Sequence, residues 1–206
     1  MVAFPTSPPT GRSMLDRQER GRRTRSTWGL TGALLVLVVG LAAQAEPPSS
    51  KLPGRKPDSR ESWGAFLGKA AHYVIGNAYS VQHPSHRVFL DPVNLSTIVK
   101  RGELGDPERL SEVARLLRPD ITDTDALVLF EIKPDNEKSR REGREQAGRY
   151  LAALNEAVDP DKKLTGGTGF EGSLFLEFED GGALWQLSWR TPEPGVTLYR
   201  WSYRRK

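Results

Sequence analysis

An acid and a base stand two residues apart at the end of an apolar segment: Glu131 and Lys133, separated by Ile132. The segment 126–133 (ALVLFEIK) is apolar up to Glu131, which predicts a strand that is buried on both faces of a sheet. Side chains at positions i and i+2 of a strand point to the same face, so Glu131 and Lys133 project together. Charged groups at the end of a buried strand are costly unless they are paired or bind a metal.

A second carboxylate, Asp120, begins a short predicted strand that precedes this segment. If the turn between the two strands spans residues 123–126, Asp120 faces Leu129 and lies one diagonal step from Glu131 on the same face. That step corresponds to roughly 7–8 Å between Cα atoms. We therefore expect the two carboxylates to converge at one end of the sheet.

Two converging carboxylates can bind one Mg²⁺ or Mn²⁺ ion through oxygen ligands. We expect Asp120 and Glu131 to hold the ion, with the backbone carbonyl of Ile132 as a third oxygen. The ion would polarise a phosphate and lower the pKa of a water molecule. Lys133 can orient that water and stabilise the charge that develops in the transition state, which suits hydrolysis of a phosphodiester.

These residues resemble the motifs of the PD-(D/E)xK nuclease superfamily, and the surrounding sequence looks especially like nuclease domains of bacterial polymorphic toxins. Three segments carry the resemblance: Pro119-Asp120, Glu131-Ile132-Lys133 and Gln146-Ala147-Gly148-Arg149-Tyr150, the last being similar to the QxxxY motif of some members. The resemblance implies a restriction-endonuclease-like fold of the α/β (α+β) class, with three layers in which helices flank a central mixed sheet. It also implies four catalytic residues: Asp120, Glu131, Lys133 and Gln146.

Several further side chains are candidates for this site. Many members of the superfamily carry a glutamate on the first helix as an extra metal ligand, but the predicted first helix of this chain has none. His72 is the candidate extra ligand or contact on that helix, and Asn77 could take the same place. The alternative for His72 is a partly buried helix histidine. Arg144, Arg149 and Tyr150 are candidate contacts to nucleic acid. A second acid-x-lysine match, at Asp161, lies in a polar loop without a preceding strand, and we expect it to be inert.

The elements that position these residues follow from periodicity and capping. The first predicted helix, 63–80, has Ser62 as its N-cap and a buried face that includes Tyr73 and Val74. The second begins at Asp106 and buries Val113. The full prediction in chain order is helix 63–80, strand 87–90, a short element 94–99, helix 106–117, strands 120–122 and 126–133, helix 138–157, and strands 173–179, 184–190 and 196–203, with a turn at 180–182.

The composition excludes several alternatives. The chain lacks cysteine and has only three histidines, which argues against disulfides, thiolate zinc sites and a histidine-rich metal site. The net charge of +4 belongs to the N-terminus, because residues 1–45 hold six arginines and two acids and leave the remainder formally neutral. Any contact with nucleic acid must therefore come from a local patch.

The N-terminus has the three zones of a secretory signal peptide. Arginines precede an apolar run, 30–43, that is shorter than the roughly 20 residues of a membrane span. The run ends in Ala43-Gln44-Ala45, so we expect cleavage before Glu46. The alternative is an uncleaved N-terminal membrane anchor. We divide the chain into a signal peptide (1–45), a disordered linker (46–61) and a nuclease-like domain (62–206).

Together these features predict an exported, metal-dependent nuclease in the periplasm or secreted medium, free of the membrane after signal cleavage. DNA is favoured over RNA as its substrate, and an antibacterial toxin effector with a cognate immunity protein is one such role. The rival is a catalytically inactive exported binding or scaffold module that retains the same fold. In a small α+β scaffold, Glu131 and Lys133 would form only an ion pair.

Overall fold

The computed structural model describes residues 50–56, 58–179 and 183–205. The chain divides into two units, Met1–Glu46 and Pro47–Lys206, and all described residues belong to the second. The predicted signal peptide (1–45) and the predicted turn at 180–182 lie outside the described residues. Within the described ranges, no helix is long and apolar enough to cross a membrane.

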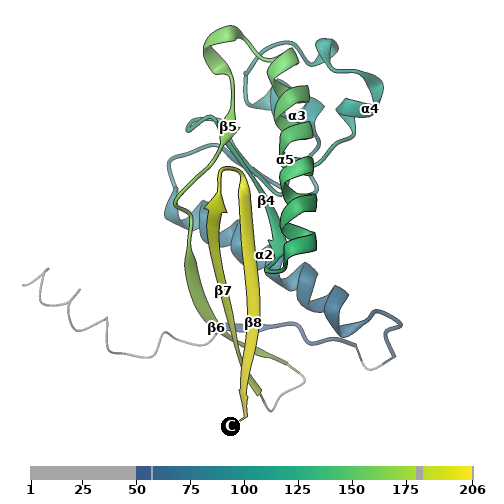
Figure 1. Ribbon diagram of the computed structural model, residues 1–206, viewed down its shortest axis with the longest axis vertical. Helices are drawn as coiled ribbons and strands as arrows, with labels where there is room; N and C mark the ends of the chain where they lie inside the picture. The colour runs from purple at the N-terminus through teal and green to yellow at the C-terminus, as the bar shows by residue number, and fades with distance from the viewer. Residues whose placement is uncertain (1–49, 57, 180–182, 206) are drawn as a thin grey trace, which may run out of the picture. The chain divides into compact units, whose positions relative to one another are not determined.

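The described strands form a mixed sheet (Figure 1), in the order β1-β6-β7-β8-β4-β3-β2 with β5 beside β4. At its centre β4 pairs antiparallel with β3 and parallel with β8. The strands are β1 (Ser50–Leu52), β2 (Val88–Leu90), β3 (Ile121–Asp123), β4 (Val128–Pro134), β5 (Thr165–Gly166), β6 (Gly172–Phe178), β7 (Ala183–Glu193) and β8 (Val196–Arg205).

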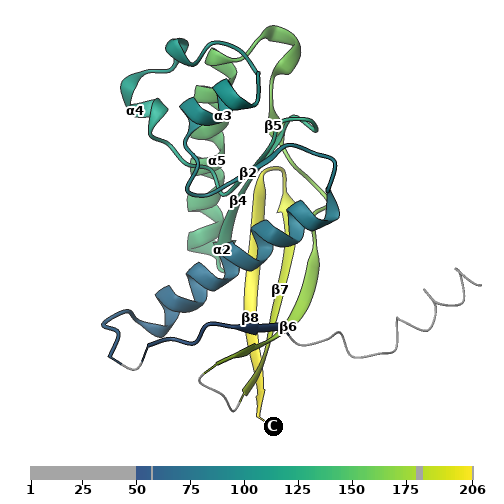
Figure 2. The ribbon, with the colours of Figure 1, turned by 180° about the vertical axis from the view of Figure 1, so that it is seen from behind.

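Two long helices lie on opposite faces of this sheet. In Figure 1 α5 (Glu137–Ala157) lies in front of the sheet, and in Figure 2, from behind, α2 (Trp63–Gln82) lies in front. The N-cap side chain of Ser62 accepts a hydrogen bond from the N–H of Ala65, and Asn136 caps α5 in the same way. The shorter helices are α3 (Leu95–Arg101), α4 (Glu112–Arg115), η1 (Pro107–Arg109) and η2 (Pro160–Lys162).

A hydrophobic cluster fills each side of β4. Ile132 and Phe130 belong to the cluster that includes Ile75 of α2, whereas Leu129 belongs to the cluster that includes Leu154 of α5. The prediction of a central strand buried on both faces is therefore confirmed. The broader prediction of a mixed α/β architecture is confirmed as well.

Two sequence predictions were wrong in detail, and the type of a third element, left open by the sequence, is defined by the structure. The predicted linker contains β1, which pairs parallel with β6. The predicted helix 106–117 is instead η1 followed by the four-residue α4, and Val113 is 76% exposed. Pro107 follows the capping residue Asp106 as predicted, but Leu110 is already extended, so the helical run breaks after one turn. The element at 94–99 is a helix, α3.

Candidate active site

The β3–β4 hairpin places Asp120 just before β3, on the side of Glu131 rather than beside Leu129. The ladder pairs Asp123 with Val128 and ends with Ile121 and Phe130, so Asp120 and Glu131 are the residues that adjoin its last pair. The predicted register was wrong by two residues because the turn extends to Leu127, which adopts a positive φ of 55°. Asp120 and Glu131 are therefore closer along the sheet than the sequence suggested.

Asp120 connects the edge of β4 to α2. Its side chain is 9% exposed. One oxygen, Oδ1, lies 2.9 Å from Nδ1 of His72, and the other, Oδ2, accepts a 2.6 Å hydrogen bond from the N–H of Ile132. The N–H and C=O of one strand residue point to the same edge, so the Ile132 carbonyl also lies on the Asp120 side of β4.

His72 is held by this carboxylate. Burial lowers its pKa, but the hydrogen bond and the negative charge of Asp120 outweigh burial, so the pKa of His72 lies above its ordinary value of 6.5. The structure thus brings the predicted first-helix residue to the predicted acid.

Glu131 is one of the most deeply buried side chains, at 2% exposure. Its Oε1 accepts a 2.7 Å hydrogen bond from Nζ of Lys133, whereas its Oε2 is buried without a hydrogen-bond partner. Burial raises the pKa of Glu131 to about 7, and the charge of Asp120 adds to this increase while Lys133 opposes it. The carboxylate therefore titrates close to neutral pH.

The third predicted motif lies beside this pair on α5. Gly143 allows the helix to approach closely, since a Cβ at that position would come 3.1 Å from Cγ of Lys133. One turn further along, Nε2 of Gln146 donates to the Tyr150 hydroxyl at 2.5 Å. Burial raises the pKa of Tyr150, and the charges of Glu131 and Asp120 contribute to the increase.

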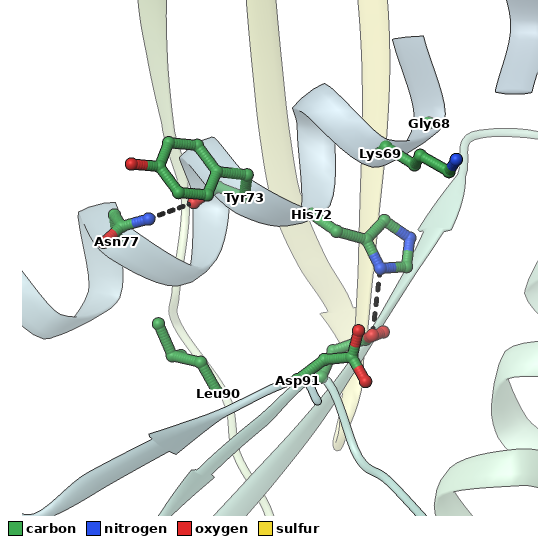
Figure 3. A pocket seen from close by; sticks show the side chains of 8 residues that line it. Gly68, Lys69, His72, Tyr73, Asn77, Leu90 and Asp91 are labelled. Carbon is green, nitrogen blue, oxygen red and sulfur yellow. Dashed lines mark hydrogen bonds and ion pairs between the residues drawn. The ribbon is translucent and has the colours of Figure 1, made fainter. Parts of the chain in front are cut away.

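A cavity of about 440 Å³ opens beside Asp120 on the α2 side (Figure 3). Its lining includes His72, Tyr73, Leu90 and Asp91. The prediction that Tyr73 faces the core was wrong: the side chain is 66% exposed. Val74 is buried as predicted, together with Ala71, Ile75, Gly76 and Tyr79.

Sequence analysis missed several residues at this site. One of them is Tyr199, which is buried in the core cluster beside α2. Its ring lies edge-on to His72 with centroids 6.3 Å apart, and the charge of Asp120 adds to the effect of burial in raising the pKa of Tyr199. Sequence analysis gave no role to Lys69 or Asp91. A usable signal existed for the helix residues, because Lys69, Tyr73 and Asn77 recur every four positions.

The remaining candidates lie at the surface. Arg144 forms an ion pair with Glu193 at 3.4 Å, so its cationic group already has a partner. Arg149 is exposed on α5. Asp161 is exposed on η2, in the polar loop expected from the sequence.

Two carboxylates of the site, those of Asp120 and Glu131, have the chemistry of divalent-cation ligands. Glu131 offers a buried oxygen without a partner, and Asp120 is near enough for its charge to raise the pKa of Glu131. Both supply the oxygen ligands that Mg²⁺ and Mn²⁺ accept. In the ranges that the structure describes, however, no three His, Asp or Glu side chains gather closely enough to hold a metal by themselves. A bound ion would therefore need backbone, water or substrate oxygens in addition.

Comparison with known proteins gives no match for this chain among protein-family models, curated proteins or solved structures. The resemblance to PD-(D/E)xK nucleases consequently depends on the motifs and geometry of this chain alone.

Proposed function

We propose that this chain is a metal-dependent nuclease that hydrolyses phosphodiester bonds, with Asp120, Glu131 and Lys133 as its catalytic residues. The observation that carries the proposal is the Glu131 carboxylate. It is buried, paired to Lys133 through one oxygen and left without a hydrogen-bond partner at the other. A buried acid with a strongly raised pKa is costly to the fold, and such groups concentrate at functional sites.

The finer fold is part of the same proposal. We infer a restriction-endonuclease-like arrangement from a mixed sheet with α2 and α5 on opposite faces (Figures 1 and 2). The positions of the motif residues support it: Asp120 immediately precedes β3, Glu131 and Lys133 lie on β4, and Gln146 lies on α5.

Each side chain has a distinct role in this proposal. Asp120, Glu131 and the Ile132 carbonyl would hold Mg²⁺ or Mn²⁺, which would neutralise phosphate charge and acidify a water molecule. His72 fixes the orientation of Asp120 through the 2.9 Å contact. The Lys133 side chain is only 18% exposed, so its charge is weakly screened and can stabilise negative charge that develops on the phosphate.

A second candidate function is a non-catalytic binding or scaffold module. The observation that favours it is the number of contacts already made within the site: His72 and the Ile132 N–H occupy the two oxygens of Asp120, and Lys133 occupies one oxygen of Glu131. In that case the four side chains would only connect α2 to β4. Export, a toxin role and an immunity partner stay predictions from the sequence.

The two candidates are separated by a cleavage assay. The whole chain is incubated with supercoiled plasmid DNA and, separately, with total RNA at pH 8, with Mg²⁺ or with EDTA. The nuclease proposal expects nicked or linear plasmid in Mg²⁺ and intact plasmid in EDTA. Cleavage of RNA but not of plasmid would identify RNA, rather than DNA, as the substrate of the nuclease. Neither substrate cleaved in Mg²⁺ or Mn²⁺ would favour the scaffold.

A further inference from the structure

The face of α2 beside Asp120 presents three side chains at four-residue intervals: Lys69, Tyr73 and Asn77. Residues four apart on a helix lie on the same face, so the three form a row along the cavity. Lys69 is 79% exposed and forms an ion pair with Glu61 at 2.9 Å. Tyr73, in the middle of the row, is a large aromatic side chain exposed next to the proposed catalytic centre.

The Tyr73 ring makes no ring contact within the described part of the chain. Tyr203 gives a useful contrast: it is 57% exposed, but its ring lies 5.3 Å from the ring of Trp185. An exposed aromatic ring without an aromatic neighbour can stack on a nucleobase, and such stacking accepts any base because every base has a π face.

The lining of the cavity suits a flat ligand with polar edges. Figure 3 shows Tyr73 and Leu90 toward one side of the cavity and His72 with Asp91 toward the other. The first pair offers apolar surface to the faces of a ring. Asp91, which is exposed, offers a carboxylate that can accept a hydrogen bond from an exocyclic amino group, as acidic side chains do from cytosine.

We infer that this cavity binds an unpaired nucleobase next to the scissile phosphate, with Tyr73 as its stacking platform. The inference builds on the proposed function and specifies its substrate class as single-stranded or locally unpaired nucleic acid. A base inside a duplex is already stacked and paired, so it would have to leave the helix to reach Tyr73. Lys69 lies one turn from Tyr73, and it could contact the adjacent phosphate only by exchanging its ion pair with Glu61 for that contact.

The test measures binding without cleavage. The whole chain carrying Glu131→Gln is titrated in EDTA against a fluorescein-labelled 12-nucleotide DNA of mixed sequence, either single-stranded or as a blunt duplex, and followed by fluorescence anisotropy. We expect tighter binding of the single strand. Adding Tyr73→Ala should weaken single-strand binding about 5- to 150-fold, the usual effect of losing one base–aromatic stack. Tyr73→Phe should bind within about twofold of the parent, because stacking does not need the hydroxyl.

Tyr203→Ala in the same background is the matched control, since it removes a similarly exposed tyrosine from β8. The inference is overturned if Tyr73→Ala weakens binding no more than Tyr203→Ala, if the duplex binds as tightly as the single strand, or if neither DNA binds. Failure of the proposed function looks different. Tyr73-dependent binding without Mg²⁺-dependent cleavage by the wild-type chain would keep the binding site and reject the nuclease. Mg²⁺-dependent cleavage at the same rate in wild type and Tyr73→Ala would keep the nuclease and reject the binding site.

Discussion

Asp123 and Glu131 are two buried carboxylates on neighbouring strands, and they differ in how many hydrogen-bond partners surround them. Asp123 is fully buried, yet both of its oxygens are hydrogen-bonded. Oδ2 accepts from the Tyr79 hydroxyl at 2.9 Å and lies 2.7 Å from Nδ1 of His86. Oδ1 accepts from two N–H groups of the following turn, those of Asp125 and Ala126.

The pKa values follow these contacts in opposite directions. Burial raises the pKa of Asp123, but the hydrogen bonds from Ala126, His86 and Tyr79 outweigh it and bring the pKa below the ordinary 3.8. Glu131 has one partner, and burial together with Asp120 raises its pKa to about 7. A buried charge that is fully hydrogen-bonded stabilises a hairpin, whereas one that is incompletely partnered is a candidate for chemistry.

The largest effect is expected from removing the charge of the incompletely partnered acid. Glu131→Gln should reduce plasmid cleavage below detection and leave the circular dichroism spectrum unchanged, because glutamine keeps the shape but loses the charge that holds the metal. Lys133→Ala should lower the rate about 10²- to 10³-fold, the usual cost of one electrostatic contact in a transition state.

Asp161→Asn is the matched control for these two variants, because it alters the other acid-x-lysine match, on the exposed η2. It should retain wild-type cleavage. A loss of activity in Asp161→Asn as large as in Glu131→Gln would show that the motif was assigned to the wrong segment.

Removing the fully partnered acid should affect stability instead of chemistry. Asp123→Ala leaves the Tyr79 hydroxyl and His86 without their acceptor, and we expect the free energy of unfolding in urea to fall by about 3 kcal/mol. Cleavage per folded molecule should stay within a few-fold of wild type. If Asp123→Ala abolished activity in the folded state, the distinction between the two acids would be lost.

The two acids should affect the pH dependence of the free energy of unfolding in opposite directions. Because the pKa of Glu131 is raised by folding, the protonated carboxyl stabilises the folded state below pH 4.5, the ordinary pKa of the group. This stabilisation is lost as the pH rises to about 7. Between pH 4.5 and 8, the free energy of unfolding of wild type in urea should therefore fall by on the order of 1–3 kcal/mol more than that of Glu131→Gln. Asp123, with a lowered pKa, should lose its contribution only as pH falls below 3.8. Parallel curves for Glu131→Gln and wild type would contradict the burial argument.

The smallest effect is expected on α5. Gln146→Ala removes the hydrogen bond to Tyr150 without removing a charge from the site, so cleavage should slow by roughly tenfold. Stability should change by less than about 1 kcal/mol. Glu145→Ala, the exposed neighbour on the same helix, should have no effect. Equal rates for the two variants would remove Gln146 from the site.

Much of the site was predictable because strand parity is a strong constraint. The alternation of side chains in ALVLFEIK put Glu131 and Lys133 on one face, and the 2.7 Å hydrogen bond between them confirms it. The register of Asp120 was not predictable to the residue, since the four-residue turn is shifted by one residue and ends at a left-handed Leu127, and leucine carries no signal for that conformation.

The face of α2 was also misassigned, for a different reason. Its sequence contains two overlapping apolar stripes, one through Tyr73 and one through Ile75 and Tyr79. Long-range contacts favour the second, because His72 reaches Asp120 and Tyr79 reaches Asp123. Both partners lie more than forty residues away along the chain, so no local pattern could have revealed them.

Mn²⁺ binding tests the central claim most directly, because it measures the proposed use of the incompletely partnered carboxylate without any substrate. Titration of the whole chain with Mn²⁺ at pH 8, followed by electron paramagnetic resonance of the free ion, is compared among wild type, Glu131→Gln and Asp123→Asn. We predict one site in wild type that Asp123→Asn retains and Glu131→Gln loses, and weaker binding at pH 6, where Glu131 is protonated. Equal binding by wild type and Glu131→Gln, or no binding by wild type, would contradict the account.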